Sequence, residues 1–271
     1  MGYNYLSLKN IVENKNIFEN KKVLTLGVLF PYVSNDKYIA ELSKNHGIDV
    51  TRPLEEFSKH IFCEVCGAKS CDALDVSEYQ GAKLICNLNL PLSQEYYEQY
   101  DVVIDAGTLE HLSNTPVAIN NIFMLLGENG IYYFANPCNG WVDHGFFQFS
   151  PTFYKDLTSD NDKLIELVNL NLAEGTSKLD VMKVENLRLT SFVTSHKKLN
   201  VSGIIRKVSR GEIKFDFIQA KYREWHNRDS KAAIKNKNIF KERLVNLFIG
   251  VCQSVVLPYR VKDALLKLVG R

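Results

Sequence analysis

Residues 101–112 read DVVIDAGTLEHL, and this stretch decides the fold. The short apolar run Val102 to Ile104 predicts a buried strand, and the strand ends at Asp105. A small-residue turn, Ala106-Gly107, then leads into Leu109-Glu110-His111. In an open parallel sheet the ligand binds beyond the carboxyl ends of the strands, so the residues from Asp105 onward are expected at a functional edge.

Short apolar segments on both sides of this stretch repeat the pattern, and helix-length segments separate them. Strands are predicted at Val23–Gly27, Ser70–Leu74, Lys83–Cys86 and Ile131–Phe134, and further strands with an antiparallel hairpin at Leu179–Val184 and Val201–Ile205. Helices are predicted at Lys37–Asn45, after Pro53, at Val117–Leu126 before the stop signals Gly127 and Asn129-Gly130, and at Thr152–Leu157. The pattern predicts an α/β fold with a doubly wound, Rossmann-like, mostly parallel sheet.

The charge of the 271-residue chain is unevenly distributed. From Val201 onward there are 16 Lys/Arg and 6 Asp/Glu, a local charge of +10; the totals of 33 and 31 leave 17 and 25 before it, a local charge of −8. We therefore expect an α/β domain at 1–209 and a basic helical extension at 210–271, with the boundary at Ser209-Arg210-Gly211. The tail suits contact with a membrane surface or another anionic partner, packing against a second copy of the chain, or a solvated face.

The apolar segments and the cysteines indicate in which cellular compartment the protein is expected. No apolar run reaches the roughly 20 residues that a membrane-spanning helix needs, and the first residues lack the apolar core of a signal peptide. The expected location is the cytoplasm, where the six cysteines stay reduced. Cys63, Cys66 and Cys71 lack an obvious fourth ligand for zinc, so no metal is expected.

Polar residues at the strand ends suit an adenosyl cofactor, which needs a close backbone approach, a carboxylate for its ribose and a polar group beside its base. Gly27 ends the first predicted strand, Asp75 the second and Asn87 the third. Asp105-Ala106-Gly107 ends the fourth and would lie under the rest of the ligand. Taken singly, such a glycine is often only a turn and such an aspartate only a helix cap. Their occurrence in order at one edge favours a binding site.

Several motifs carry a resemblance to a known family. Residues 101–112 resemble the motif after the fourth strand of class I S-adenosylmethionine-dependent methyltransferases, which commonly ends in Leu-Glu-His. Val23–Gly27 resembles their first glycine motif, and Gly130–Pro137 their fifth strand. His144–Tyr154, HGFFQFSPTFY, resembles one subgroup that is often encoded with bacterial surface-polysaccharide (capsule or O-antigen) genes. The resemblance covers residues 21–154.

The resemblance implies transfer of a methyl group from S-adenosylmethionine, leaving S-adenosylhomocysteine, to an oxygen of a small polar acceptor. The acceptor would contain sugar or phosphate and serve surface-polysaccharide synthesis. His144 is the expected catalytic base, because histidine titrates near neutrality, and Asp143 and Glu110 would orient it or hold the acceptor. The candidates for substrate contact are His111, Gln148 and Tyr154.

One departure from the family leaves other functions open. The family carries Asp/Glu-x-Gly-x-Gly-x-Gly after its first strand, whereas this chain has TLGVLFPY at 25–32, in which only Gly27 matches. Either the loop binds the cofactor differently, or the chain is a non-catalytic binding or scaffold protein of the same fold. A nucleic-acid methyltransferase is disfavoured, because Asn136-Pro137 is only part of the amino-methylating Asn/Asp-Pro-Pro-Tyr/Phe motif.

Overall fold

A computed structural model describes residues 2–33, 36–78, 80–174, 181–183, 198–220 and 222. An α/β unit comprises Met1–Lys183 and Lys197–Phe217, so it includes residues 210–217, which lie beyond the boundary expected from the sequence. The helices predicted farther along the tail lie outside the described residues, apart from Ala220 and Tyr222. No helix among the described residues is both long enough and apolar enough to cross a membrane.

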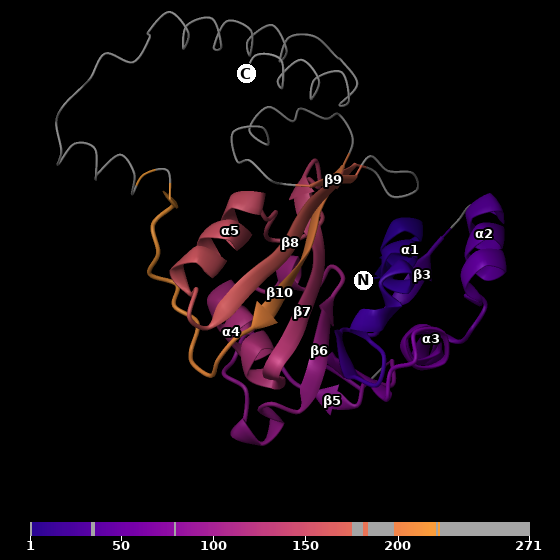
Figure 1. Cartoon of the computed structure of the whole chain (residues 1–271), viewed down its shortest axis with the longest axis horizontal. Helices are drawn as coiled ribbons and strands as arrows, with labels where there is room; N and C mark the ends of the chain where they lie inside the picture. Colours follow the sequence, from indigo (N-terminus) through magenta and orange to yellow (C-terminus); the bar gives the residue numbers. More distant parts are fainter. Residues whose placement is uncertain are drawn as a thin grey trace, which may run out of the picture. The chain divides into compact units, whose positions relative to one another are not determined.

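Among the described residues, the central sheet of the α/β unit has eight strands in the order β5-β4-β2-β6-β7-β10-β8-β9 (Figure 1). The strands β5, β4, β2, β6 and β7 run parallel, whereas β10 is antiparallel to both β7 and β8. This topology confirms the predicted doubly wound, mostly parallel sheet with antiparallel strands after the parallel ones. The two predicted segments do not form a hairpin with each other, because β9, within Leu179–Val184, pairs with β8, and β10, which contains Val201–Ile205, lies between β7 and β8. The strands are β2 Lys22–Leu26, β4 Ser70–Asp75, β5 Leu84–Ile85, β6 Tyr100–Asp105, β7 Leu126–Asn139, β8 Ile165–Glu174, β9 Val181–Lys183 and β10 Leu199–Lys207.

Helices cover both faces of this sheet (Figure 1). On one side lie α1 (Tyr5–Glu13), α2 (Asp36–His46) and α3 (Leu54–Lys59), and on the other lie α4 (Thr115–Leu125) and α5 (Pro151–Asp160). Three of the predicted helices match α2, α4 and α5 closely. The prediction for α5 succeeds because Ser150 caps it, accepting a hydrogen bond from the Thr152 amide at 3.2 Å, and Pro151 occupies its first turn.

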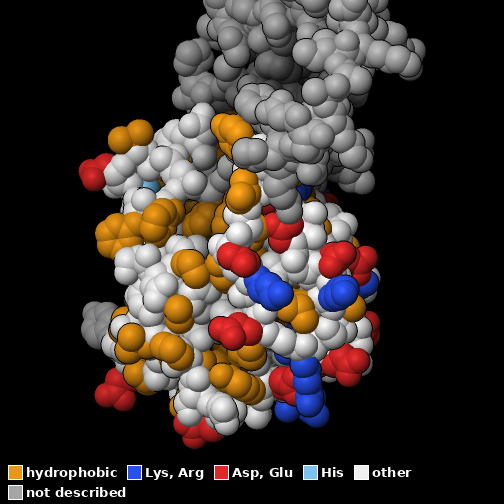
Figure 2. Space-filling model, turned by 90° about the vertical axis from the view of Figure 1, so that its left-hand side faces the viewer, with side chains coloured by type: hydrophobic (Ala, Val, Ile, Leu, Met, Phe, Trp, Pro, Cys, Tyr) orange, Lys and Arg blue, Asp and Glu red, His pale blue; other side chains and the backbone are white. Residues whose placement is uncertain are grey.

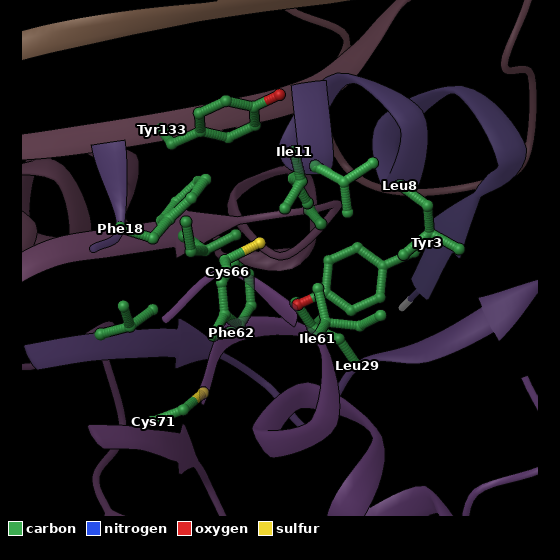
Figure 3. Packing of buried hydrophobic residues seen from close by; sticks show 14 of the residues in the cluster. Tyr3, Leu8, Ile11, Phe18, Leu29, Ile61, Phe62, Cys66, Cys71 and Tyr133 are labelled. Atoms are coloured by element: carbon green, nitrogen blue, oxygen red, sulfur yellow. The ribbon is translucent and has the colours of Figure 1, made fainter. Parts of the chain in front are cut away.

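The helix after Pro53 has a more irregular course than its sequence pattern predicts. Helix α3 continues into a π-helix, η2 (His60–Val65), which keeps Phe57 and Ile61 buried on one side. Cys66 and Cys71 pack in the same core, where burial raises the pKa of the Cys66 thiol to about 12 and that of Cys71 further (Figure 3). These two thiols therefore behave as small buried hydrophobic groups.

Strand β7 is longer than the predicted segment Ile131–Phe134 at both ends. Helix α4 ends at Leu125, one residue before the predicted end, because Leu126 already pairs with Tyr100 of β6. The predicted stop signals Gly127 and Asn129-Gly130 lie within β7, and Asn129 adopts a positive φ of 58°. The helix therefore ends where strand pairing begins, ahead of these residues.

The N-terminal segment is part of the core, which the sequence analysis does not predict. Strand β1 (Gly2–Asn4) pairs in parallel with β3 (Phe30–Tyr32), the segment that follows the first sheet strand. Tyr3 is fully buried, and its ring lies 6.0 Å from the ring of Phe57 and 6.3 Å from that of Phe62 (Figure 3). The first residues therefore cover the edge of the fold at which ligands are expected.

One face of the unit shows no concentration of a single charge. Figure 2 looks onto the side on which Figure 1 shows α4 and α5, where acidic and basic side chains are interspersed with hydrophobic ones. Such a mixture is typical of a solvent-facing surface, since apolar atoms make up much of any protein surface.

Replacing Leu8 by Ala tests whether α1 belongs to the folded unit. Leu8 is fully buried, so its truncation should lower the free energy of unfolding by about 2–5 kcal/mol. Leu90→Ala is the matched control, because Leu90 is 60% exposed, and it should change stability by less than about 0.5 kcal/mol. Urea denaturation measures both; equal midpoints for the two variants would show that α1 does not pack as described.

Candidate active site

The residues predicted to bind a cofactor lie side by side at one edge of the sheet. The Gly27 amide donates to the carbonyl of Leu74 at 2.7 Å, so the end of β2 lies against the end of β4. The Cys86 amide donates to the carbonyl of Asp75 at 2.8 Å, which places the end of β5 next to β4. On the other side of β2, the Thr108 hydroxyl donates to the carbonyl of Leu26 at 2.6 Å. The order along the edge is therefore that expected from the sequence.

Gly27 has the conformation that a close backbone approach requires. Its φ of 82° lies in the left-handed region that favours glycine. The next two residues, Val28 and Leu29, are buried, and the chain then enters β3 and pairs with the N-terminal strand. The rest of this segment is therefore hydrophobic core and edge strand, whereas the glycine motif that Val23–Gly27 resembles carries further glycines there.

Asp75 and Asn87 keep polar atoms available to a ligand. The Oδ1 atom of Asp75 accepts a bond from the adjacent Val76 amide, and its Oδ2 atom makes no hydrogen bond within the described part of the chain. Asn87 is exposed; its Oδ1 atom accepts from the amide and the side chain of Asn89, which leaves its own side-chain amide directed to no described partner.

Asp105 has a different role from the one expected. Its side chain is fully buried and accepts four hydrogen bonds, from the amides of Thr108 and Leu109 (2.8 and 3.3 Å), the Tyr132 hydroxyl and the Asn136 side chain (both 2.8 Å). Because these donors occupy both carboxylate oxygens, the prediction that Asp105 contacts a cofactor is corrected to a supporting role. Ala106 and Gly107, which follow it, line the adjoining cavity.

Tyr154 also supports the site from below instead of contacting a substrate. It is fully buried, its ring stacks on Phe134 at 4.0 Å, and its hydroxyl donates to the Oδ1 atom of Asn136 at 3.0 Å. The side-chain amide of Asn136 in turn donates to Asp105 and, at 3.4 Å, to the Oε2 atom of Glu110. Asn136 therefore joins the two buried acids.

Glu110, His111 and His144 form one cluster. The Oε1 atom of Glu110 lies 3.5 Å from Nε2 of His144 and 4.0 Å from Nε2 of His111, and the two imidazole rings meet edge to face at 5.2 Å. The Glu110 side chain is 1% exposed, whereas each histidine side chain is 41% exposed. Glu110, which is expected to orient His144 or hold the acceptor, thus lies beside His144, and His111 joins them.

The electrostatics of the cluster follow from its burial. Burial, reinforced by the charge of Asp105, raises the pKa of Glu110 to about 8. Partial burial lowers the pKa of His111, and the neighbouring His144 lowers it further. For His144 burial is again the main cause of a lowered pKa, followed by the charge of Lys198. At neutral pH the two imidazoles are therefore mostly neutral.

The loop that carries His144 is anchored on Glu110. The carbonyl of Glu110 accepts bonds from the amides of Phe146 and Phe147 at 2.8 and 3.2 Å. Gly145 packs so closely that a Cβ there would lie 2.9 Å from Cγ of Glu110, so a side chain would displace the loop. The backbone thus fixes His144 beside the buried acid.

Two other predicted residues belong to this loop but not to the cluster. Asp143 is exposed, has a positive φ of 63°, and forms no hydrogen bond or ion pair with His144 in the described structure; Glu110 takes that orienting position. Gln148 is exposed, and its Oε1 atom accepts from the Trp141 amide at 3.1 Å, which closes the loop. Whether either contacts an acceptor stays a prediction.

A cavity of about 480 Å³ lies in front of the cluster. Its described lining contains no Lys or Arg, and most of its side-chain amides and hydroxyls come from the N-terminal segment and from β10. The sequence analysis misses this half of the wall, because its residues come from segments without a recognisable motif. The lining residues are Gly2, Asn4, Ser7, Asn10, Tyr32, Ala106, Gly107, Glu110, His111, Tyr133, Ala135, Pro137, Trp141, His144, Ala173, Asn200 and Ser202.

Of the three comparisons with known proteins, only the one with solved structures gives matches. No protein-family model matches the sequence, and no curated protein matches it. The structure is similar to 1,6-didemethyltoxoflavin-N1-methyltransferase of Burkholderia thailandensis, solved with S-adenosylhomocysteine, at 13% identity over 76% of this chain and 78% of that chain, with a TM-score of 0.42.

Two further similar structures are also methyltransferases. The N-methyltransferase NodS of Bradyrhizobium japonicum has 12% identity, covering 76% of this chain and 94% of that chain, with a TM-score of 0.42. A SAM-dependent methyltransferase of Thermotoga maritima has 12% identity, covering 76% and 90%, with a TM-score of 0.41. At identities this low, the function has to be argued from the residues of this chain.

Replacing Tyr132 by Phe tests the support of the two acids. The change removes one donor from the buried Asp105 carboxylate and should destabilise the protein by about 1.5–3 kcal/mol. Tyr32→Phe is the control, since Tyr32 is 61% exposed, and it should change stability by less than about 0.5 kcal/mol. Thermal unfolding compares them; if Tyr132→Phe were as stable as its control, the carboxylate would not depend on this bond.

Proposed function

We propose that this chain is an S-adenosylmethionine-dependent methyltransferase that acts on a small polar acceptor. The observation that carries the proposal is that Gly27, Asp75 and Asn87 follow neighbouring strand ends, and that Ala106 and Gly107, after the adjoining strand β6, line the cavity in front of His144. The described residues fit the adenosyl part of the cofactor, because a carboxylate oxygen and a side-chain amide point from neighbouring strand ends and a left-handed glycine adjoins them.

The chemistry divides between cofactor and protein. When bound, S-adenosylmethionine supplies an electrophilic methyl group that a nucleophilic acceptor atom takes by direct displacement. Ala106 and Gly107 separate the two parts of the site with little side-chain bulk, so that the acceptor lies close to the cofactor edge. His144 receives the proton of the acceptor hydroxyl, and the bonds from the amides of Phe146 and Phe147 to the Glu110 carbonyl keep the loop of His144 beside Glu110.

The cavity lining favours a neutral, polyhydroxylated acceptor such as a sugar. Asn200 and Ser202 offer both donors and acceptors, and Trp141 contributes an aromatic ring. The described lining contains no Lys or Arg that could pair with a phosphate group, and Lys198, beside the lining, lies over the Trp141 ring at 4.3 Å. Methylation of a sugar oxygen agrees with the resemblance of residues 144–154 to methyltransferases of surface-polysaccharide synthesis.

The proposal extends to the parts of the chain outside the site. With a local charge of +10 from Val201 onward, we propose that the tail contacts an anionic surface, or a second copy of the chain, beyond the α/β unit. A cytoplasmic location agrees with a cofactor and thiols that belong to that compartment.

Calorimetric titration with S-adenosylmethionine and S-adenosylhomocysteine tests the cofactor site. We expect micromolar binding of both, weakened at least tenfold, or about 1.4 kcal/mol, by Asp75→Ala. Asp162→Ala, which removes an exposed aspartate just after α5, should bind like the unmodified protein. An absence of binding by the unmodified protein would instead favour the non-catalytic scaffold, since the segment after Gly27 departs from the family.

Methyl transfer to candidate acceptors tests the role of His144. With a neutral glycoside that serves as acceptor, His144→Ala should lower turnover by about 100- to 10,000-fold while cofactor affinity stays unchanged. His46→Gln, at the end of α2, is the control and should leave the rate unchanged. Unaltered turnover in His144→Ala would contradict the assignment, and a preference for phosphorylated over neutral glycosides would contradict the acceptor class.

A further inference from the structure

In the cluster of Glu110, His111 and His144, three side chains converge, although proton transfer would need only two. One atom from each side chain, a carboxylate oxygen and two imidazole nitrogens, lies within 4.8 Å of the other two. Proton transfer from an acceptor requires a single imidazole and a group to orient it. A second imidazole that also converges on the same oxygen points to a shared ligand.

The buried carboxylate supplies an independent observation. The Oε1 atom of Glu110 is buried and has no hydrogen-bond partner, although the rest of the residue is held firmly. Leaving such an atom unpaired costs about 1–3 kcal/mol. The orphaned atom faces Gly107, where a Cβ would lie only 3.1 Å from it, so the glycine leaves open the space in front of the oxygen. That space belongs to the cavity.

The donor set indicates the class of ligand. Two imidazole nitrogens and one carboxylate oxygen are a common ligand set for divalent first-row transition metals, and three protein ligands leave coordination positions open. With bonds of about 2.1 Å, neighbouring ligand atoms in such a site lie roughly 3–3.5 Å apart. The distances from Glu110 of 3.5 and 4.0 Å approach these values, and rotation of the half-exposed histidine side chains closes the difference.

We propose that Glu110, His111 and His144 bind one divalent transition-metal ion, such as Zn²⁺ or Mn²⁺, at the wall of the cavity. This assignment replaces the expectation from the sequence that the protein holds no metal. The sequence analysis associates Glu110 with His144 and assigns His111 to substrate contact, but it does not predict that the three side chains converge on one point.

The surroundings resemble the outer shell of a metal site. Asn136 donates to the second oxygen of Glu110 at 3.4 Å and so orients the first toward the cavity. The indole of Trp141 lies 4.8 Å from the imidazole of His144, and its own N–H donates to the carbonyl of Leu199 at 3.0 Å. These contacts fix two of the three ligands without occupying their metal-binding atoms.

The proposal that an ion binds rests on this geometry alone, whereas a role of the ion in methyl transfer rests on the proposed function. In that role His144 would be a metal ligand. An acceptor hydroxyl would take an open coordination position, and the cation would lower the pKa of that hydroxyl. The proton then leaves to solvent, and no electron is transferred. Without a metal, His144 remains the base.

The test is titration of the full chain, stripped of metal by a chelator, with Zn²⁺ in a calorimeter and with Co²⁺ followed by visible absorption. We expect one ion per chain and a cobalt absorption band. His111→Gln and Glu110→Gln should each weaken binding at least tenfold and abolish the band. His111→Gln is the safer variant, since this side chain is half-exposed, and circular dichroism checks the folding of both.

Matched variants identify where an ion binds. His46→Gln and Cys63→Ser remove a surface imidazole and a half-buried thiol, and both should keep the affinity and the cobalt band. The proposal is overturned if no ion binds stoichiometrically, if binding survives His111→Gln combined with His144→Gln, or if Cys63→Ser abolishes it.

A parallel titration separates this proposal from the proposed function. Cofactor binding without metal binding would overturn the proposed metal site and leave the proposed methyltransferase with His144 as base. Metal binding without cofactor binding would support the metal site and overturn the proposed methyltransferase function. If both bind, a chelator should lower turnover at least tenfold and added Mn²⁺ or Zn²⁺ should restore it; full turnover in the chelator would limit the ion to a structural role.

Discussion

The carboxylate of Asp105 is the constraint on which the rest of the site depends. A fully buried acid is tolerated only when donors surround it, and here they come from the turn after β6, from β7 and, through Asn136, from α5. This single group therefore fixes how two strand ends and one helix meet. The turn that carries Ala106, Gly107 and Glu110 has its shape because its amides bind Asp105.

Asp105 also affects the hydrogen bonding and the pKa of Glu110. The two acids are buried close together, and Asn136 donates to both, but most of the donors go to Asp105. Asp105 receives four hydrogen bonds, whereas Glu110 is left with one oxygen unpaired and its pKa raised. Because of this unequal division, Asp105 fixes the backbone of the turn, whereas Glu110 keeps its Oε1 atom without a hydrogen-bond partner.

Much of the fold can be predicted from the sequence because parallel strands are short apolar runs that end in polar residues. Gly27, Asp75 and Asn87 follow this rule, and their alignment along one edge follows from the topology alone. The role of Asp105 could not be predicted, because an acid at a strand end looks the same whether it faces a ligand or a ring of buried donors. The cavity wall was missed for another reason: Gly2 and Ser202 lie about 200 residues apart in the sequence, in segments without a recognisable motif, and only the fold brings them to one cavity.

The pairing of β1 with β3, together with the position of β10, makes the two halves of the site unequal in how they assemble. The edge that carries Gly27, Asp75 and Asn87 is built from β2, β4, β5 and β6, which all lie within residues 22–105. The cavity wall joins the first residues of the unit to β10, which is nearly its last segment, and therefore needs almost the whole unit. During synthesis on the ribosome, the strands of this edge emerge well before β10, so the cavity can be enclosed only when most of the unit has been made. Substitutions in β10 can therefore reshape the cavity wall without touching the strand ends of the other half.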